Sequence, residues 1–273
     1  MRDFSNIKVI FIDIDGTLTD SNKNIPLKNI LAIEKAVKSG ILVVICSGRA
    51  QEYASKIALT AKTSQYLISN NGAQIFDFKE NKTLYANKIP NNSAKKLLEG
   101  IKEYGIDAIL NTTNGRFKTP NLLRKLDEKE KVLKSINDIE DEEILQIVCE
   151  TKSYNAMTNL INGVKLDKEL KILNLSRAYL ENKKDQKSYY ADINNNSTSK
   201  GRGITSFLNI FNIKKEDSLC FGDFINDIDM FKACGYKVAM KNASEELKEI
   251  ADYVTLSNNE AGVGDFIEKF ILK

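Results

Sequence analysis

An apolar run near the beginning of the chain, IKVIFIDI at residues 7–14, limits the fold more than any other feature of the sequence. It consists almost entirely of β-branched and aromatic residues. Such a run is typical of a strand that is covered on both faces, as strands in parallel sheets are. The run ends in two aspartates and a glycine, in the stretch FIDIDGTLTD. Two carboxylates this close repel each other unless a cation or a shared proton lies between them.

Helical and strand-like segments alternate after this run. Residues 26–39 and 50–62 have apolar side chains at helical spacing, whereas residues 41–47 and 66–70 are short apolar runs that predict buried strands. A β-α-β-α-β order requires right-handed crossovers between parallel strands. We therefore expect an α/β fold with a Rossmann-like, doubly wound parallel sheet.

The middle of the chain has a different pattern. Strand-like pieces such as DAILNTT and ILQIVCE alternate there with helix-like pieces, and the strands are more polar. The α/β pattern resumes near the end. We therefore expect an α/β core formed by residues 1–82 and 188–273, interrupted by an inserted α+β domain over residues 83–187. Within the insert, the charge-dense segment 123–143 is interpreted as a solvated helix surface.

Composition narrows the classes of function. The 273 residues include 40 basic and 37 acidic side chains, and the net charge of +3 is too small to indicate nucleic-acid binding. No apolar run approaches the roughly 20 residues that cross a bilayer. The first apolar run ends in aspartates, which does not match a signal peptide. We expect a cytoplasmic protein that acts on a small molecule, without a nucleic-acid or membrane partner.

The cysteine and histidine contents restrict the chemistry. None of the four cysteines forms a CxxC pair, so a zinc site is not expected; they are Cys46, Cys149, Cys220 and Cys234. The chain has no histidine. It therefore lacks the usual general base and the commonest zinc ligand. Acid–base chemistry near neutral pH would fall to carboxylates, lysine, tyrosine or cysteine.

Polar residues gather where the predicted strands end. Ligands of open parallel sheets bind at the carboxyl ends of the strands. The residues at these ends, or at the start of the helix before the strand near 219, are Asp13, Asp15, Ser47, Gly48, Arg49, Asn71, Lys200, Asp223, Asn226 and Asp227. Each motif alone has an ordinary structural explanation, such as a turn or a helix cap. Four such short stretches, each at a strand end or a helix start, together indicate a common site.

The chemistry that suits this set is phosphoryl transfer. Oxygen ligands favour Mg²⁺, which would neutralise the carboxylates and offset the charge of a phosphate. One carboxylate can attack phosphorus and form an aspartyl-phosphate, and a second can protonate the leaving oxygen and then accept a proton from water. Lys200, the Ser47 hydroxyl and nearby backbone N–H groups would hold the other phosphate oxygens.

Four motifs of the chain resemble those of the haloacid dehalogenase superfamily of phosphohydrolases. They are DIDGTL, CSGR with Ser47, STSKG with Lys200, and GDFINDIDM. The SNNGA stretch, the position of the insert and the C-terminal stretches AMKNASEELKEIADYVT and NNEAGVGDFIEKF are similar to the Cof-type branch, which carries a large α/β cap domain at this position.

The resemblance implies a role for each matching residue. It implies that Asp13 is the nucleophile and Asp15 the general acid and base. It also implies a Mg²⁺ site formed by Asp13, the backbone carbonyl of Asp15, Asp223 and Asp227, the last binding directly or through another group. The residues implied at the phosphate are Ser47, Gly48, Lys200 and Asn226, with Arg49 and Asn71 lining the site.

The sequence departs from the family pattern at two places. Lys241 stands where glycine is common, and the bulky pair Phe224 and Ile225 lies inside the fourth motif. The main hypothesis is a Mg²⁺-dependent phosphatase of sugar phosphates, nucleotides or phosphorylated cofactors. A phosphomutase, a phospho-aspartate receiver and a sugar-phosphate binding protein are alternatives. The insert and Asp15 argue against a receiver, since Asp15 would speed the loss of the phosphate.

Overall fold

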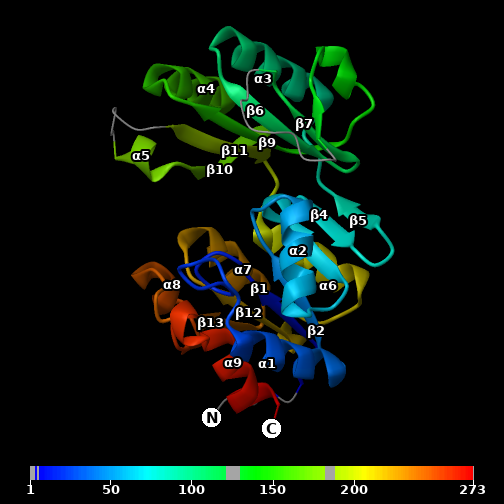
Figure 1. Ribbon diagram of the computed structural model, residues 1–273, viewed down its shortest axis with the longest axis vertical. Coiled ribbons are helices and arrows are strands. Elements are labelled where there is room, and N and C mark those ends of the chain that lie inside the picture. Colours follow the sequence, from blue (N-terminus) through cyan, green and yellow to red (C-terminus); the bar gives the residue numbers. More distant parts are fainter. Residues whose placement is uncertain (1–3, 5, 121–129, 182–187, 273) are drawn as a thin grey trace. The chain divides into compact units, whose positions relative to one another are not determined.

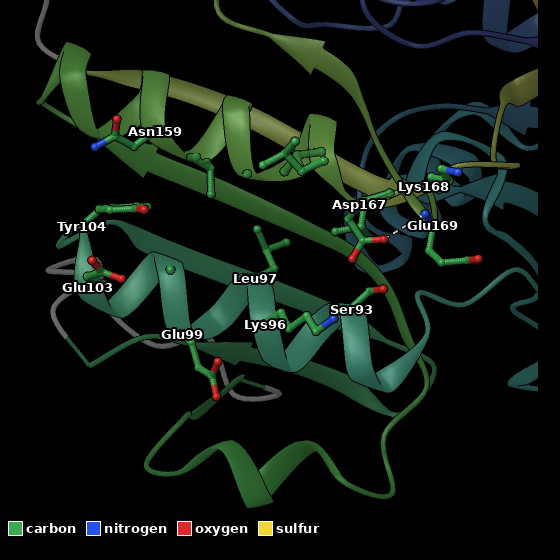
Figure 2. A pocket seen from close by; sticks show the side chains of 16 residues that line it. Ser93, Lys96, Leu97, Glu99, Glu103, Tyr104, Asn159, Asp167, Lys168 and Glu169 are labelled. Atoms are coloured by element: carbon green, nitrogen blue, oxygen red, sulfur yellow. Dashed lines mark hydrogen bonds between the residues drawn. The ribbon is translucent and has the colours of Figure 1, made fainter.

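A computed structural model describes residues 4, 6–120, 130–181 and 188–272 (Figure 1). The chain forms two compact units. The first unit contains Met1–Tyr85 and Ser199–Lys273, and the second contains Ala86–Thr198. The second unit is therefore inserted into the first one. The sequence-based division into a core of residues 1–82 and 188–273 and an inserted domain of residues 83–187 stays a prediction.

The first unit is built on an eight-stranded sheet with the order β14-β13-β12-β1-β2-β3-β4-β5. Its strands are β1 (Val9–Ile12), β2 (Leu42–Cys46), β3 (Tyr66–Ser69), β4 (Gln74–Asp77), β5 (Lys82–Ala86), β12 (Ser218–Gly222), β13 (Tyr236–Ala239) and β14 (Tyr253–Val254). The strands from β14 to β3 are parallel, and β4 pairs antiparallel with β3. The predicted parallel α/β fold is confirmed. The antiparallel edge is an addition that the sequence did not indicate.

Helices of the first unit connect these strands. They are α1 (Leu27–Lys38), α2 (Gln51–Ala61), α6 (Lys200–Ile210), α7 (Ile228–Ala233), α8 (Glu245–Glu249) and α9 (Gly262–Phe266). Helix α1 packs against α2 and α9, whereas α6 packs against α7. Short 3₁₀ turns occupy Asn70–Gly72, Lys215–Asp217, Ile225–Asp227 and Asn258–Glu260, and a π-helical turn occupies Ile267–Ile271.

The centre of this sheet is where the chain changes direction. Strand β1 lies between β12 and β2, and its four residues have no exposed surface. The chain proceeds from β1 to β2 and β3 on one side, whereas β12, β13 and β14 extend the sheet on the other side (Figure 1). Such a switch point opens a crevice at the carboxyl ends of the two strands, which is where ligands bind in doubly wound folds.

The second unit is an α+β unit with its own sheet, in the order β10-β11-β9-β6-β7-β8. Its strands are β6 (Asp107–Thr112), β7 (Gly115–Lys118), β8 (Glu130–Val132), β9 (Ile144–Thr151), β10 (Leu170–Leu175) and β11 (Tyr189–Asn195), and its helices are α3 (Asn91–Glu103), α4 (Tyr154–Leu166) and α5 (Arg177–Leu180), with a 3₁₀ turn at Ile136–Ile139. Helices α3 and α4 pack on each other and on the sheet. The apolar faces of these helices and of the sheet form a separate core. It includes Leu97 of α3, Leu160 of α4 and Tyr189 of β11.

Two sequence-based expectations need correction. The predicted helix surface at 123–143 contains strand β8 instead, which pairs parallel with β7, and residues 121–129 lie outside the described part. The pair between Arg116 and Glu130, with 3.0 Å between Nη1 and the carboxylate, joins these strands. The α/β pattern near the end of the sequence predicts one helix at 225–234, which the structure divides into a 3₁₀ turn and α7. In the described part, no helix is both long and apolar enough to span a bilayer.

Candidate functional site

The ends of β1 and β12 place two aspartates next to each other. Asp13 follows the last residue of β1, and Asp223 follows the last residue of β12. The N–H group of Asp13 donates to the carbonyl oxygen of Phe221 at 3.2 Å, so the pairing of the strands continues to their ends. The parallel register therefore brings the first and fourth sequence motifs to the same edge of the sheet.

Three carboxylates meet at this edge. Asp13, Asp223 and Asp227 each offer an oxygen within 4.8 Å of the other two. Asp13 and Asp227 are 6% and 0% exposed, and Asp223 is half-buried. The carboxylate of Asp15 is not part of this group. Negative charges that are this close and this poorly hydrated require positive charge nearby.

Lys200 supplies part of this charge. Its Nζ lies 2.6 Å from a carboxylate oxygen of Asp13 and 2.6 Å from one of Asp227. Lys200 is the first residue of α6 and is only 3% exposed. The hydroxyl of Ser199 caps this helix by accepting from the N–H of Arg202 at 3.1 Å. Lys200, which the sequence predicts at the phosphate site, is thus a buried member of the cluster.

Burial and charge change the acidity of the cluster. Burial raises the pKa of Asp13 from 3.8 to about 7, against the opposing effect of Lys200, and the charge of Asp227 adds to the rise. Burial and the charge of Asp227 also raise the pKa of Asp223, to about 6. The pKa of Lys200 is raised because Asp13 and Asp227 favour the ammonium form despite its burial. One ammonium therefore does not fully neutralise three carboxylates.

Asp15 has a partner of its own. Arg49 donates from Nε and Nη2 to the two carboxylate oxygens of Asp15, at 2.8 and 3.0 Å. The guanidinium also lies over the ring of Tyr53, 5.5 Å from its centroid. Both members of the pair remain partly exposed, at 49% for Arg49 and 42% for Asp15. The structure thus brings together two predicted site residues, with Arg49 directed at Asp15.

The turn after β2 packs against the turn after β3. Ser47 is 1% exposed, and its hydroxyl accepts from the N–H of Arg49 at 3.3 Å. The N–H of Asn71 donates to the carbonyl of Ser47 at 3.1 Å. A methyl group at Gly48 would lie 2.5 Å from Oδ1 of Asn71, so a side chain there would force Asn71 to shift. Asn71 has a left-handed φ of 61°. The structure therefore packs Ser47, Gly48 and Asn71 closely against one another.

Asn226 is placed differently from the other predicted residues. It lies in the 3₁₀ turn that separates Asp223 from α7, and it is exposed. Asp227, at the end of the same turn, is completely buried, and its Oδ2 accepts from the N–H groups of Asp223 and Phe224 at 3.0 and 3.2 Å. Within the described residues, the Asn226 side chain forms no hydrogen bond to the cluster.

Some residues that organise the site were not found in the sequence. The Thr17 hydroxyl donates to Oδ1 of Asp223 at 2.9 Å. The Asn242 amide donates to the carbonyl of Gly16 at 2.8 Å, and its oxygen accepts from the N–H of Asn258 at 2.9 Å. Asn242 lies in the stretch MKNA, next to Lys241. Asn242 and Gly16 are more than two hundred residues apart in the sequence, and no local pattern predicts their contact.

The family comparison agrees with this geometry. A model of the haloacid dehalogenase-like hydrolase family matches residues 10–267, which is nearly the whole chain. The chain belongs to this family. The resemblance of its four motifs to the superfamily is therefore confirmed. All four motifs lie within the matched residues 10–267.

Two curated relatives of this hydrolase are named as phosphatases. Two proteins of Bacillus subtilis named as 5-amino-6-(5-phospho-D-ribitylamino)uracil phosphatases, YcsE and YwtE, are 30% and 29% identical to it; each alignment covers at least 97% of both chains. The fold is also that of a haloacid dehalogenase-like hydrolase from Bacteroides thetaiotaomicron, with a TM-score of 0.81 and 22% identity over 96% of this chain and 99% of the other.

Proposed function

We propose that this hydrolase is a Mg²⁺-dependent phosphatase that releases phosphate from small phosphorylated metabolites in the cytoplasm. Candidate substrates are sugar phosphates, nucleotides and phosphorylated cofactors. The observation that carries the proposal is the contact of Lys200 with both Asp13 and Asp227, beside Asp223. A phosphate bound at this edge would meet a nucleophilic carboxylate and a fixed ammonium together.

The donor set fits a magnesium ion. All three side chains of the cluster offer oxygen, and after pairing with Lys200 two of the three negative charges remain without a cation. Hard divalent cations prefer such ligands. Asp13, Asp223, Asp227 and the backbone carbonyl of Asp15 would hold the ion. When bound, it would supply positive charge toward the phosphate oxygens.

The reaction then proceeds through two successive displacements at phosphorus, both carried out by residues of this chain. In the first, a carboxylate oxygen of Asp13 bonds to phosphorus while the bond from phosphorus to the leaving oxygen breaks, and Asp15 gives that oxygen a proton. In the second, water attacks the phosphorus of the aspartyl-phosphate and gives a proton to Asp15, which restores the Asp13 carboxylate and frees inorganic phosphate. Lys200 stabilises the charge on the transferred group.

The remaining predicted residues would bind or orient the phosphate. We assign Ser47, the N–H of Gly48, and Asn226 to this task, with Arg49 and Asn71 at the edge of the site. The close packing of Ser47, Gly48 and Asn71 supports the assignment, because pre-organised donors need no rearrangement during the reaction. The named activity of the two Bacillus subtilis relatives supports a small phosphate ester as the substrate.

The test is phosphate release from a panel of phosphorylated sugars, nucleotides and cofactors. The purified protein is assayed with Mg²⁺ and with a chelator, beside an Asp13→Asn variant. We expect turnover that requires Mg²⁺ and disappears in the variant. Product analysis separates a hydrolase from a phosphomutase, because a mutase returns the phosphoryl group to the organic product. Absence of release from every compound, with a stably phosphorylated Asp13, would overturn the proposal.

A further inference from the structure

Two large apolar side chains are exposed in the loop of the fourth motif. Phe224 is 59% exposed and Ile225 is 50% exposed, and they are consecutive in the chain. Neither belongs to the apolar core of the first unit as described. Single exposed apolar residues are common on protein surfaces and need no explanation. An adjacent pair enclosed by Asp223 and Asp227, which belong to the acidic cluster, does need one.

The backbone that carries this pair is fixed. The N–H of Phe224 donates to Oδ2 of Asp227 at 3.2 Å, and the N–H of Asp227 donates back to the carbonyl of Phe224 at 2.9 Å. The carbonyl of Asp223 accepts from the N–H of Ser244 at 2.9 Å. Because Asp227 is itself held by Lys200, the loop is tied to the centre of the cluster. The exposure of the pair is therefore a property of the ordered loop.

The pair is also close to the place where a phosphate would bind. Successive α-carbons are about 3.8 Å apart, so Phe224 begins one such step from Asp223 and Ile225 begins at most about 7 Å from it. A phosphate held at the cluster directs its ester oxygen and leaving group away from the carboxylates. A phenylalanine side chain at this distance is long enough to contact the first atoms of that leaving group.

We propose that Phe224 and Ile225 form an apolar platform that selects phosphate monoesters with a planar ring near the phosphate. The inference rests on the proposed phosphatase function and names a substrate class within it. A ring laid on the platform would remove apolar surface of both partners from water, and aromatic rings gain further from offset or edge-to-face contact. A polyol chain would gain little there and would lose part of its hydration.

The test compares two esters with the same CH₂–O–P linkage, benzyl phosphate and glycerol 1-phosphate. Both leaving groups are primary alcohols, so the ratio of their kcat/KM values reports recognition more than chemistry. For Phe224→Ala we expect kcat/KM for benzyl phosphate to fall about tenfold, which is the effect of about 1.4 kcal/mol of lost contact. For the same variant we expect kcat/KM for glycerol 1-phosphate to change less than about twofold. Phe224→Tyr keeps the ring and should keep the preference.

A matched control is Leu59→Ala. Leu59 is 64% exposed, but it lies near the C-terminal end of α2, and this helix leads away from the strand ends that carry the site. This variant should leave both esters unchanged. An equal loss for both esters in Phe224→Ala would overturn the platform and assign Phe224 to the shape of the loop. No loss for either ester would overturn it as well.

Binding of benzylphosphonate and methylphosphonate, measured by calorimetry, needs no turnover. Tighter binding of benzylphosphonate that is lost in Phe224→Ala would support the platform even if no ester were hydrolysed, in which case only the phosphatase proposal would fail. Hydrolysis with equal affinity for the two phosphonates would contradict the platform and leave the phosphatase proposal standing.

Discussion

The α-carbon of Gly16 faces the carboxylate of Asp223 so closely that a methyl group on Gly16 would lie 2.3 Å from Oδ2 of Asp223. Gly16 also has a φ of +82°, which side chains rarely tolerate. The neighbouring Thr17 donates its hydroxyl to the other oxygen of the same carboxylate. The glycine of the first motif thus provides space for the aspartate of the fourth.

The substitution Gly16→Ala should therefore displace Asp223. We expect kcat to fall at least about 100-fold, comparable to the loss of one pre-organised catalytic group, and the Mg²⁺ concentration needed for half-maximal activity to rise. Magnesium titrations of the steady-state rate measure both effects. Gly105→Ala is the control, since Gly105 also has a positive φ but has no atom within 4 Å of the added methyl. Equal effects of the two substitutions would assign the loss to backbone strain alone.

The substitution Lys200→Met should affect activity and stability together. It leaves three neighbouring carboxylates without their ammonium, and breaking a buried ion pair costs about 3–5 kcal/mol. We expect a loss of kcat of at least about 100-fold, a lower melting temperature in chelator, and partial recovery of the melting temperature in Mg²⁺. Thermal unfolding with and without Mg²⁺, beside steady-state kinetics, measures these. A variant that keeps its stability but loses activity would contradict the structural part of this prediction.

The substitution Asp15→Asn should separate the two displacements. With p-nitrophenyl phosphate the leaving group needs no proton, so Asp13 can still be phosphorylated, whereas the attacking water has lost its base. We expect a burst of about one equivalent of nitrophenolate per enzyme followed by slow turnover, the kinetic sign of a covalent intermediate. Rapid-mixing absorbance measures the burst. Steady turnover without a burst would show that Asp15 is not needed for the second displacement.

A related variant, Arg49→Lys, tests the orientation of Asp15. Lysine cannot make the two parallel hydrogen bonds that Arg49 makes with the Asp15 carboxylate. We expect kcat for an alkyl phosphate, which needs a proton from Asp15, to fall about tenfold, within the usual contribution of general acid–base catalysis. The release of nitrophenolate in the burst phase should fall less. Equal losses for both substrates would assign Arg49 to phosphate binding instead.

The sequence predicts the centre of the fold well because local pattern and final environment agree there. The residues of β1 are apolar throughout, and the structure buries them all. Prediction from the sequence fails where a long-range contact decides the structure. An example is β8, a strand in a charge-rich segment, where Glu130 pairs with Arg116. Local sequence contains no information about such a partner.

The same distinction applies to the candidate site. Residues at strand ends could be predicted from the rule for parallel sheets, and Asp13 and Asp223 do meet. The pairing of Asp15 with Arg49 depends on how two loops approach each other, and so does the contact of Asn242 with Gly16. Motif spacing indicates which residues share a site, but it does not indicate which of them touch.

The stability of the metal-free protein should depend on pH. Burial raises the pKa of Asp13 from 3.8 to about 7 and that of Asp223 from 3.8 to about 6. Between about pH 4 and 7 the folded protein therefore holds protons that the unfolded chain has released. The stability they contribute is complete below pH 4 and is lost as the pH rises through these values. In chelator, the free energy of unfolding should fall by about 4 kcal/mol from pH 5 to pH 7.5.

Urea unfolding at several pH values, in chelator and in Mg²⁺, measures this dependence. The pKa of Glu34 is lowered to about 2 by its hydrogen bonds to Lys62 and Lys38. Its effect on stability therefore varies with pH only below the range from pH 5 to pH 7.5. The raised pKa of Lys200 contributes a constant amount here, because its stabilisation is lost only above about pH 10.5. Asp13→Asn should flatten the curve, since it removes the larger shift, and Mg²⁺ should flatten it by competing with protons. Stability of the metal-free protein that rises from pH 5 to pH 7.5 would contradict the raised pKa values of Asp13 and Asp223. It would also contradict the view that the cluster carries excess negative charge.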